Sequence, residues 1–275
     1  MQTGQPSHPI RHPMCPPPKV PVDWGRFRAV LFDLDGVITQ SARIHAAAWK
    51  ETFDDFLARY SKTTGTAFEP FDIHRDYTRH VDGLPRRGGI RAFLKSRGLT
   101  LDEGSPDAPA TSDTIAGLAN QKNAAFHRIL ERDGISLYQD ALVLLRGVEA
   151  RGCRTGLITS SRNCAAVLAA AGLTGRFDVE VDGVVAARLQ LAGKPAPDTF
   201  LEAARRLGVT PSQAALVEDS IAGIKAASAG GFALVIAVDR AGIAAELRAA
   251  GADLVVDDLA CLVEGVERTS PELGP

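Results

Sequence analysis

The sequence predicts an α/β protein in which a doubly wound parallel sheet carries an inserted α-helical cap domain. From about residue 137 onward, short apolar strands alternate with helices, which is typical of parallel sheets with right-handed crossovers. Between residues 42 and 136, apolar residues recur at helical spacing and no convincing strand is present. Because a strand precedes this helical stretch and more strands follow it, the stretch is predicted to be an insertion into the sheet domain.

Composition and charge narrow the class of protein. The 275 residues are 45% hydrophobic and 23% charged, which is ordinary for a globular protein that buries a core. The net charge of −2 gives no electrostatic case for nucleic acid or an anionic membrane, and no apolar run approaches the roughly 18 residues that span a bilayer. The four cysteines are scattered, so we expect reduced thiols, a cytoplasmic protein and a monomer.

Both ends of the chain look unlike a folded domain. Residues 1–25 are rich in proline and are predicted to form a disordered tail without the apolar centre of a secretory signal. Residues 266–275 are predicted to be frayed. The expected organisation is therefore a core made of 26–41 and 137–265, with the helical cap at 42–136 between its two parts.

The first strand carries the most informative motif. The buried apolar run Ala29–Phe32 is followed by Asp33 and Asp35, one residue either side of Leu34, and then by Gly36. Side chains of a strand alternate, so both carboxylates are expected on the same side. Two such anions repel each other unless a cation or a proton lies between them. An acidic turn after a strand is the alternative, and this motif alone leaves it open.

The remaining elements follow in chain order. A helix from about residue 42 contains His45 and Trp49, a loop with glycines and cations covers 77–89, and a helix restarts at Ile90. Residues 100–112 read as a surface loop, and a helix is expected at 113–132. The later helices are predicted at 141–150, 163–171, 199–207 and 221–229, and the later strands at 154–158, 177–181, 215–217, 233–238 and 253–256. Polar residues end several of these strands, at the edge where parallel sheets bind ligands.

Four short motifs occur at these strand ends, in the order Asp33-x-Asp35-Gly36, Thr159-Ser160, Lys194-Pro195 and Glu218-Asp219-Ser220-x-x-Gly223. Together they resemble the four motifs of the haloacid dehalogenase superfamily, which joins a Rossmann-like core to a mobile cap. The resemblance covers about residues 27–265 and is greatest to the β-phosphoglucomutase branch.

This resemblance implies a role for each motif residue. Asp33 would be the nucleophile that becomes an aspartyl phosphate, and Asp35 the general acid and base. Asp33, Glu218 and Asp219 would bind Mg²⁺, with the carbonyl of Asp35 completing the shell. Thr159 and Lys194 would complete the catalytic set by holding phosphoryl oxygens and offsetting the carboxylates.

Residues of the cap and the second motif would contact a small sugar phosphate. Arg86 would hold the distal phosphate, although Arg87 leaves the register open by one residue. Trp49 is also expected in the core, and His45 is also expected as an interface histidine. Gln40 departs from the hinge Asp of many relatives, and the loop at 100–112 is long for a compact cap. The full set of expected substrate contacts is Ser160, Ser161, Arg86, His45, Trp49, Lys122 and Asn123.

The resemblance implies a Mg²⁺-dependent enzyme that isomerises β-glucose 1-phosphate to glucose 6-phosphate. A sugar-phosphate phosphatase, for example on trehalose 6-phosphate, would use the same residues and is the alternative. A phospho-accepting signalling module or a non-catalytic partner-binding protein is disfavoured, because the cap is large and no motif position is lost.

Overall fold

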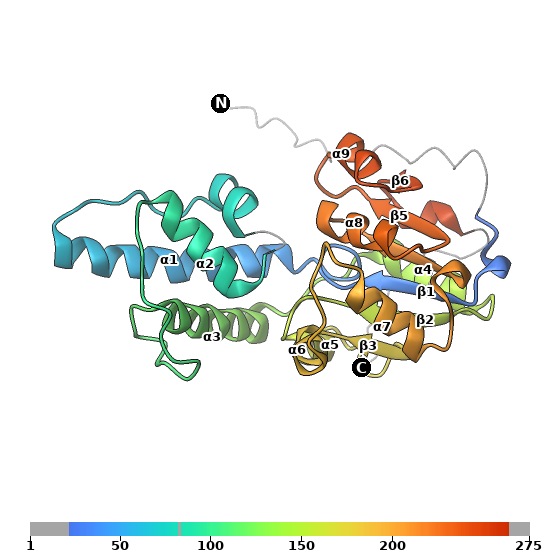
Figure 1. The fold of residues 1–275 in the computed structure, drawn as a ribbon, viewed down its shortest axis with the longest axis horizontal. Helices are drawn as coiled ribbons and strands as arrows, with labels where there is room; N and C mark the ends of the chain where they lie inside the picture. The colour runs from blue at the N-terminus through green and yellow to red at the C-terminus, as the bar shows by residue number, and fades with distance from the viewer. Residues whose placement is uncertain (1–21, 82–83, 264–275) are drawn as a thin grey trace, which may run out of the picture.

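A six-stranded parallel sheet forms the centre of the larger domain. The computed structural model describes residues 22–81 and 84–263, and in this part of the chain the strand order is β3-β2-β1-β4-β5-β6 (Figure 1). Every neighbouring pair is parallel. The strands are β1 (Ala29–Asp33), β2 (Arg154–Ile158), β3 (Val179–Val181), β4 (Ala214–Glu218), β5 (Leu234–Val238) and β6 (Leu254–Val256).

β1 is central because its side chains are apolar on both faces. Val30 and Phe32 pack into one hydrophobic cluster, whereas Ala29 and Leu31 pack into another on the opposite face. The first cluster is covered by α4 (Gln139–Glu149) and α5 (Cys164–Ala170). The second is covered by α7 (Asp198–Arg206), α8 (Ile221–Ala229) and α9 (Ala244–Ala249). This two-sided burial is what a doubly wound parallel sheet requires.

The core begins earlier than the sequence predicts. Trp24 starts a short 3-10 helix (Trp24–Arg26), is almost fully buried and donates from Nε1 to Leu262 O at 2.7 Å. Placing residues 22–25 in the disordered tail was therefore wrong, because the buried indole ties this segment to the far end of the core. The rest of the expected N-terminal tail and the expected frayed end at 266–275 lie outside the described residues.

Three helices form a separate unit beside the sheet (Figure 1). They are α1 (Ala42–Thr64), α2 (Arg86–Ser96) and α3 (Ile115–Asp133), with one π-helical turn, η2 (Tyr77–Val81), before α2. Phe53 lies at the centre of their own core, with ring centroids 4.0 Å from Phe93 and 5.2 Å from Phe71. Within the described residues, no helix has the length and apolar character needed to cross a membrane.

Two adjacent stretches of chain join the helical unit to the sheet domain. The N–H of Gln40 donates to Ser136 O and that of Tyr138 donates to Ile38 O, both at 2.9 Å. The chain thus leaves after β1 and returns beside its own exit. β2 then pairs with one edge of β1 and β4 with the other, which makes the carboxyl end of β1 the switch point of the sheet.

Some local features differ from the sequence-based expectations. The expected loop at 77–89 contains the π-helical turn and the first residues of α2. Two short helices, α6 (Gly183–Leu189) and α9, were not predicted. With only seven and six residues, they are too short to show a helical period in the sequence.

Candidate active site

Asp33 ends β1, and its side chain is almost fully buried at the carboxyl edge of the sheet. Lys194, in the loop before α7, donates from Nζ to Asp33 Oδ1 at 2.5 Å and also to Glu218 Oε1. Burial alone would lower the pKa of the Lys194 ammonium, but the two carboxylates raise it above its ordinary value. The lysine is therefore a permanent positive charge beside the predicted nucleophile.

Glu218 ends β4 and is fully buried. Its Oε2 accepts the backbone N–H groups of Asp219 and Ser220, both at 2.7 Å, and the Ser220 hydroxyl at 2.9 Å. A Cβ on Gly223 would lie 1.9 Å from Glu218 Oε1, so only glycine lets α8 approach this closely. These contacts hold the carboxylate in one orientation toward Lys194.

Asp33, Glu218 and Asp219 form a cluster suited to a metal ion. One carboxylate oxygen from each lies within 4.8 Å of the other two. Burial raises the pKa of Asp33. The negative charges of Glu218 and Asp35 raise it further, and the positive charge of Lys194 opposes this rise. Because one lysine does not balance these carboxylates, the site favours a further cation, and an all-oxygen donor set suits a hard divalent ion. The Asp35 side chain is not in this cluster, so any metal contact from Asp35 would have to come from its carbonyl.

The turn after β1 is shaped by Gly36. Its φ is +87°, a region that favours glycine, and a Cβ there would lie 1.8 Å from Asp219 Oδ2. Arg240 donates from Nε to Gly36 O at 3.3 Å, while its guanidinium carbon lies 3.8 Å from the Tyr138 ring centroid. Glycine therefore allows the turn to approach the carboxylate cluster, and Arg240 links it to the chain returning from the helical unit.

Asp35 connects the sheet domain to the start of α1. Its carboxylate accepts from Thr159 Oγ1 at 2.9 Å and from Ser41 Oγ, and its Oδ1 lies 3.8 Å from His45 Nε2. Burial alone would raise the pKa of Asp35, but the contacts with His45, Ser41 and Thr159 lower it to about 2. Burial and the charge of Lys122 lower the pKa of His45. At neutral pH Asp35 is therefore ionised, with His45 and the two hydroxyl groups around its carboxylate.

The loop after β2 is internally hydrogen-bonded. Thr159 Oγ1 accepts the N–H of Ser161 at 3.0 Å, and Ser161 Oγ accepts the N–H of Asn163 at 3.1 Å. Ser160 and Arg162 are exposed, whereas Asn163 is buried. The loop thus places hydroxyl groups beside Asp35 and an amide toward the helical unit.

Arg86 and Asn123 meet the core through Asn163. Asn123 Oδ1 accepts from Arg86 Nη2 at 2.8 Å and from Asn163 Nδ2 at 3.0 Å, so one amide oxygen bridges α2, α3 and the loop after β2. Burial lowers the pKa of Arg86, and the charge of Arg162 lowers it further. Arg86 is therefore the arginine that contacts Asn123, whereas the charge of Arg87 helps to lower the pKa of Glu103, in the loop before α3.

Lys122, His45 and Trp49 pack together at the base of the helical unit. Lys122 Nζ lies 2.7 Å from His45 Nδ1 and 5.2 Å from the Trp49 ring centroid. Burial and the charge of Arg86 lower the pKa of Lys122 to about 7. Trp49 is 4% exposed and stacks on Phe53 in the core of the helices, so it contacts Lys122 rather than an open binding surface.

The structure brings nearly all of the predicted residues into one region between the sheet edge and the helices. Sequence analysis did not select Ser41, Arg162, Asn163 and Arg240. Arg162 and Asn163 directly follow the Thr159-Ser160-Ser161 run, and a search of the whole loop for phosphate-binding groups would have included them. Nothing near Arg240 in the sequence indicates its contact with Gly36, which lies 204 positions away.

Comparisons with known proteins agree with this geometry. Residues 27–231 match the family model for haloacid dehalogenase-like hydrolases. A β-phosphoglucomutase from Mycobacterium bovis is 46% identical over 241 residues, covering 86% of this chain and 92% of that protein. A fructose-1-phosphate phosphatase from Escherichia coli is 30% identical over 75% of this chain and 94% of that protein.

A solved structure extends the similarity to the fold. A β-phosphoglucomutase from Clostridium difficile superposes with a TM-score of 0.64 at 25% identity, covering 86% of this chain and 94% of that one. The four motifs, the strand order and these relatives lead to one conclusion: this chain belongs to the haloacid dehalogenase superfamily, is β-phosphoglucomutase-like, and is an enzyme of the phosphomutase or phosphatase type.

Proposed function

We propose that this protein is a Mg²⁺-dependent phosphomutase that converts β-glucose 1-phosphate to glucose 6-phosphate through an aspartyl phosphate on Asp33. The observation that carries the proposal is the buried Asp33 carboxylate beside Lys194, with a second carboxylate, Asp35, held separately by Thr159 and Ser41. The 46% identity to a β-phosphoglucomutase over most of both chains supports the same substrate.

Asp33, Glu218 and Asp219 would bind Mg²⁺, which would supply positive charge at the transferring phosphoryl group. Lys194 adds a fixed positive charge beside Asp33 and Glu218. We infer that Thr159, Ser160 and Ser161 offer hydroxyl and backbone N–H donors to the phosphoryl oxygens.

Asp35 would move the proton in both half-reactions. The phosphorus–oxygen bond to Asp33 breaks as the 6-hydroxyl oxygen of the sugar attacks, and Asp35 takes the hydroxyl proton. With its pKa lowered to about 2, the Asp35 carboxylate is ionised at neutral pH and so is in the form that can accept a proton. After the bisphosphate turns round, its 1-phosphoryl group transfers to Asp33, and Asp35 returns the proton to the leaving oxygen.

Arg86 would bind the phosphate that is not being transferred. Its guanidinium donates to Asn123 Oδ1, which also accepts from Asn163, so a cation and two amides meet where the helices reach the core. An arginine fork binds phosphate oxygens in pairs and so fixes the orientation of the sugar. Lys122 and His45 lie next to this group and complete its polar side.

The alternative is a sugar-phosphate phosphatase in which water replaces the sugar hydroxyl as the acceptor from Asp33. The E. coli fructose-1-phosphate phosphatase, 30% identical over most of its length, is the observation that favours it. Trehalose 6-phosphate is a further candidate substrate for such an enzyme. We expect a monomer in the cytoplasm in either case.

A product assay separates the two functions. The enzyme is incubated with β-glucose 1-phosphate, Mg²⁺ and a trace of glucose 1,6-bisphosphate. Accumulation of glucose 6-phosphate supports the mutase. Stoichiometric release of inorganic phosphate would instead support the phosphatase and rule out the mutase. Trehalose 6-phosphate and fructose 1-phosphate serve as parallel substrates in the phosphate-release assay.

A further inference from the structure

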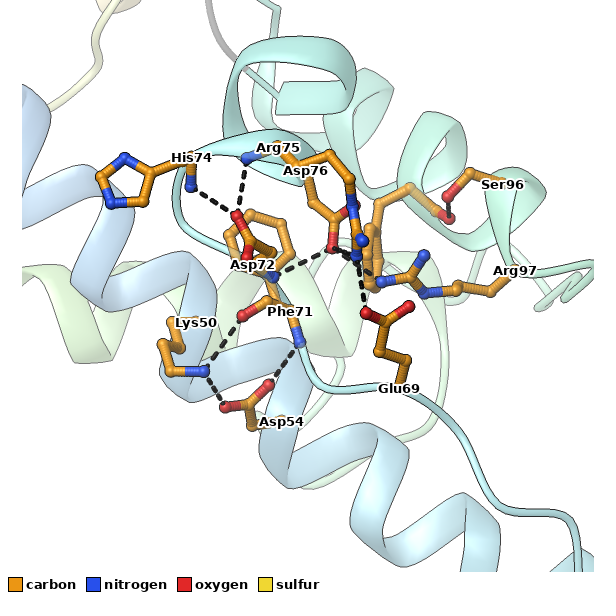
Figure 2. A network of polar contacts seen from close by, with 11 residues as sticks. Lys50, Asp54, Glu69, Phe71, Asp72, His74, Arg75, Asp76, Ser96 and Arg97 are labelled. Atoms are coloured by element: carbon orange, nitrogen blue, oxygen red, sulfur yellow. Dashed lines mark hydrogen bonds and ion pairs between the residues drawn. The ribbon is translucent and has the colours of Figure 1, made fainter.

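Arg86 belongs to a segment whose two ends meet at a buried ion pair. Segment 77–96 contains η2 and α2, and its residues 82–83 lie outside the described part of the chain. Asp76 immediately precedes the segment and Arg97 immediately follows it. Arg97 Nη2 donates to Asp76 Oδ2 at 2.7 Å, and the two side chains are only 15% and 2% exposed (Figure 2).

The carboxylate of Asp76 is fully engaged at this position. Its Oδ2 also accepts the N–H of Asp72 at 2.9 Å, and its Oδ1 accepts from Arg75 Nε at 3.2 Å. The guanidinium carbon of Arg97 lies 4.9 Å from the Phe93 ring centroid. The ion pair is therefore desolvated and packed, unlike the exposed pair that Arg91 on the same helix makes with Glu103.

The chain just before Asp76 is attached to α1. Lys50 Nζ donates to Phe71 O at 3.0 Å, and the N–H of Phe71 donates to Asp54 Oδ1 at 2.7 Å (Figure 2). Two side chains of α1 thus bind the backbone of Phe71, one at its carbonyl and one at its N–H. The Phe71 ring is buried against Phe53 and Phe93. The base of segment 77–96 is thereby fixed to the helix that also carries His45.

Inside the segment, α2 packs directly on η2. A Cβ on Gly89 would lie 3.3 Å from Val81, so glycine at this position allows a close approach. Arg86 is the first residue of α2, at the end opposite Arg97. The place of its guanidinium beside Asn123 therefore depends on how the whole helix is held, and the ion pair with Asp76 adds a polar contact at the C-terminal end of α2 to the packing of Phe93.

We propose that Asp76 and Arg97 are positioning residues for Arg86: their buried ion pair holds the C-terminal end of α2 and so sets the position from which Arg86 binds the distal phosphate. The proposal rests on the proposed function for the identity of the substrate. It assigns the pair to substrate binding by the helical unit, and not to phosphoryl transfer at Asp33.

The test uses the double variant Asp76→Asn/Arg97→Met, which removes the ion pair without leaving an unpaired buried charge. The full-length enzyme is assayed for isomerisation of β-glucose 1-phosphate and for hydrolysis of acetyl phosphate, a small donor without a distal phosphate. We expect KM for the sugar phosphate to rise roughly tenfold, with acetyl phosphate turnover within about twofold of wild type. Arg91→Met, which removes the exposed pair of the same helix, is the matched control and should change neither.

Hydrogen exchange of the same variants gives a readout that does not depend on the substrate. Amides of 86–96 should exchange faster in the double variant, whereas those of α3 and β1 should be unchanged. Arg97→Lys keeps the positive charge, so its KM for the sugar phosphate should lie between those of wild type and the double variant. The proposal is overturned if the double variant keeps the wild-type KM, if both activities fall together, or if exchange in 86–96 is unchanged. If the wild-type enzyme does not isomerise β-glucose 1-phosphate, the proposed function fails and the exchange experiment still decides the role of the pair.

Discussion

Replacing Lys194 by methionine tests the electrostatic account of the site. Methionine keeps much of the side-chain length, so the substitution removes the positive charge with little loss of packing. Lys194 contacts Asp33 at 2.5 Å and also Glu218, and the three side chains are 10%, 6% and 0% exposed. The variant therefore leaves two buried carboxylates without the cation that balances them.

The structure indicates a large cost in stability. Removing one partner of a buried ion pair typically costs about 3–5 kcal/mol, because the remaining charge cannot regain its hydration. Mg²⁺ bound to Asp33, Glu218 and Asp219 would replace part of the lost charge. At a concentration 100 times its Kd, an ion that binds only the folded state adds about 2.7 kcal/mol. Lys194 repels a cation at the same carboxylates, so the variant should bind Mg²⁺ more tightly than wild type. We therefore expect the loss relative to wild type to be larger in a chelator than in Mg²⁺.

Urea unfolding, followed in EDTA and in excess Mg²⁺, measures both effects. Arg205→Met on α7 is the matched control, since Arg205 pairs with Glu202 but is 71% exposed and should contribute less than about 1 kcal/mol. A loss for Lys194→Met no larger than that of the control would refute the reasoning. So would a loss of several kcal/mol that Mg²⁺ leaves unchanged.

The remaining predictions concern catalysis. Asp33→Asn should abolish turnover while leaving the fold intact, since Lys194 still pairs with Glu218; activity near wild type would exclude the aspartyl-phosphate mechanism. Chelation of Mg²⁺ should stop catalysis, and Asp219→Ala should raise the Mg²⁺ concentration needed for half-maximal rate; full activity in excess EDTA would count against the cluster. Arg86→Ala should cost on the order of 2–4 kcal/mol, or roughly 30- to 1000-fold in kcat/KM, on sugar phosphates while sparing acetyl phosphate, with Arg87→Ala as the control for register. Lys122, whose pKa burial and Arg86 lower to about 7, should lose its proton as pH rises through that value. KM for the sugar phosphate should then increase on the alkaline side, and Lys122→Met should lose this pH dependence; a profile identical to wild type would contradict it.

Sequence analysis predicted the parts of the site that depend on local patterns. Asp33 and Glu218 directly follow or end short apolar strands, and parallel strands bring their carboxyl ends to one edge whatever their order. Gly36 and Gly223 belong to the same motifs. Each lets the backbone approach a carboxylate more closely than a residue with a Cβ could. These features are encoded within a few residues, and a reading of strand ends is enough to find them.

Contacts between the helical unit and the core could not be predicted in the same way. The choice of Arg86 over Arg87 depends on which face of α2 packs toward Asn123. Trp49 was expected both in the core and at the substrate, and its ring stacks on Phe53 within the helical core. The segment expected as one loop at 77–89 contains η2 and the start of α2, and a buried ion pair between Asp76 and Arg97 lies just outside these two elements. Each of these outcomes is decided by packing between elements distant in sequence.

By itself, the sequence determined the alternation of strands and helices, the insertion after the first strand, and the carboxylates, hydroxyls and lysine at the strand ends. Only the tertiary structure decided that Lys194 lies between Asp33 and Glu218, that Asp35 is held by Thr159 and Ser41, and that Arg86 and Asn163 share the oxygen of Asn123. The physical reason is range. Backbone periodicity and turn chemistry act over a few residues. The charge balance and hydrogen bonds of the site join residues as many as 204 positions apart, and their meeting depends on the packing of the whole chain.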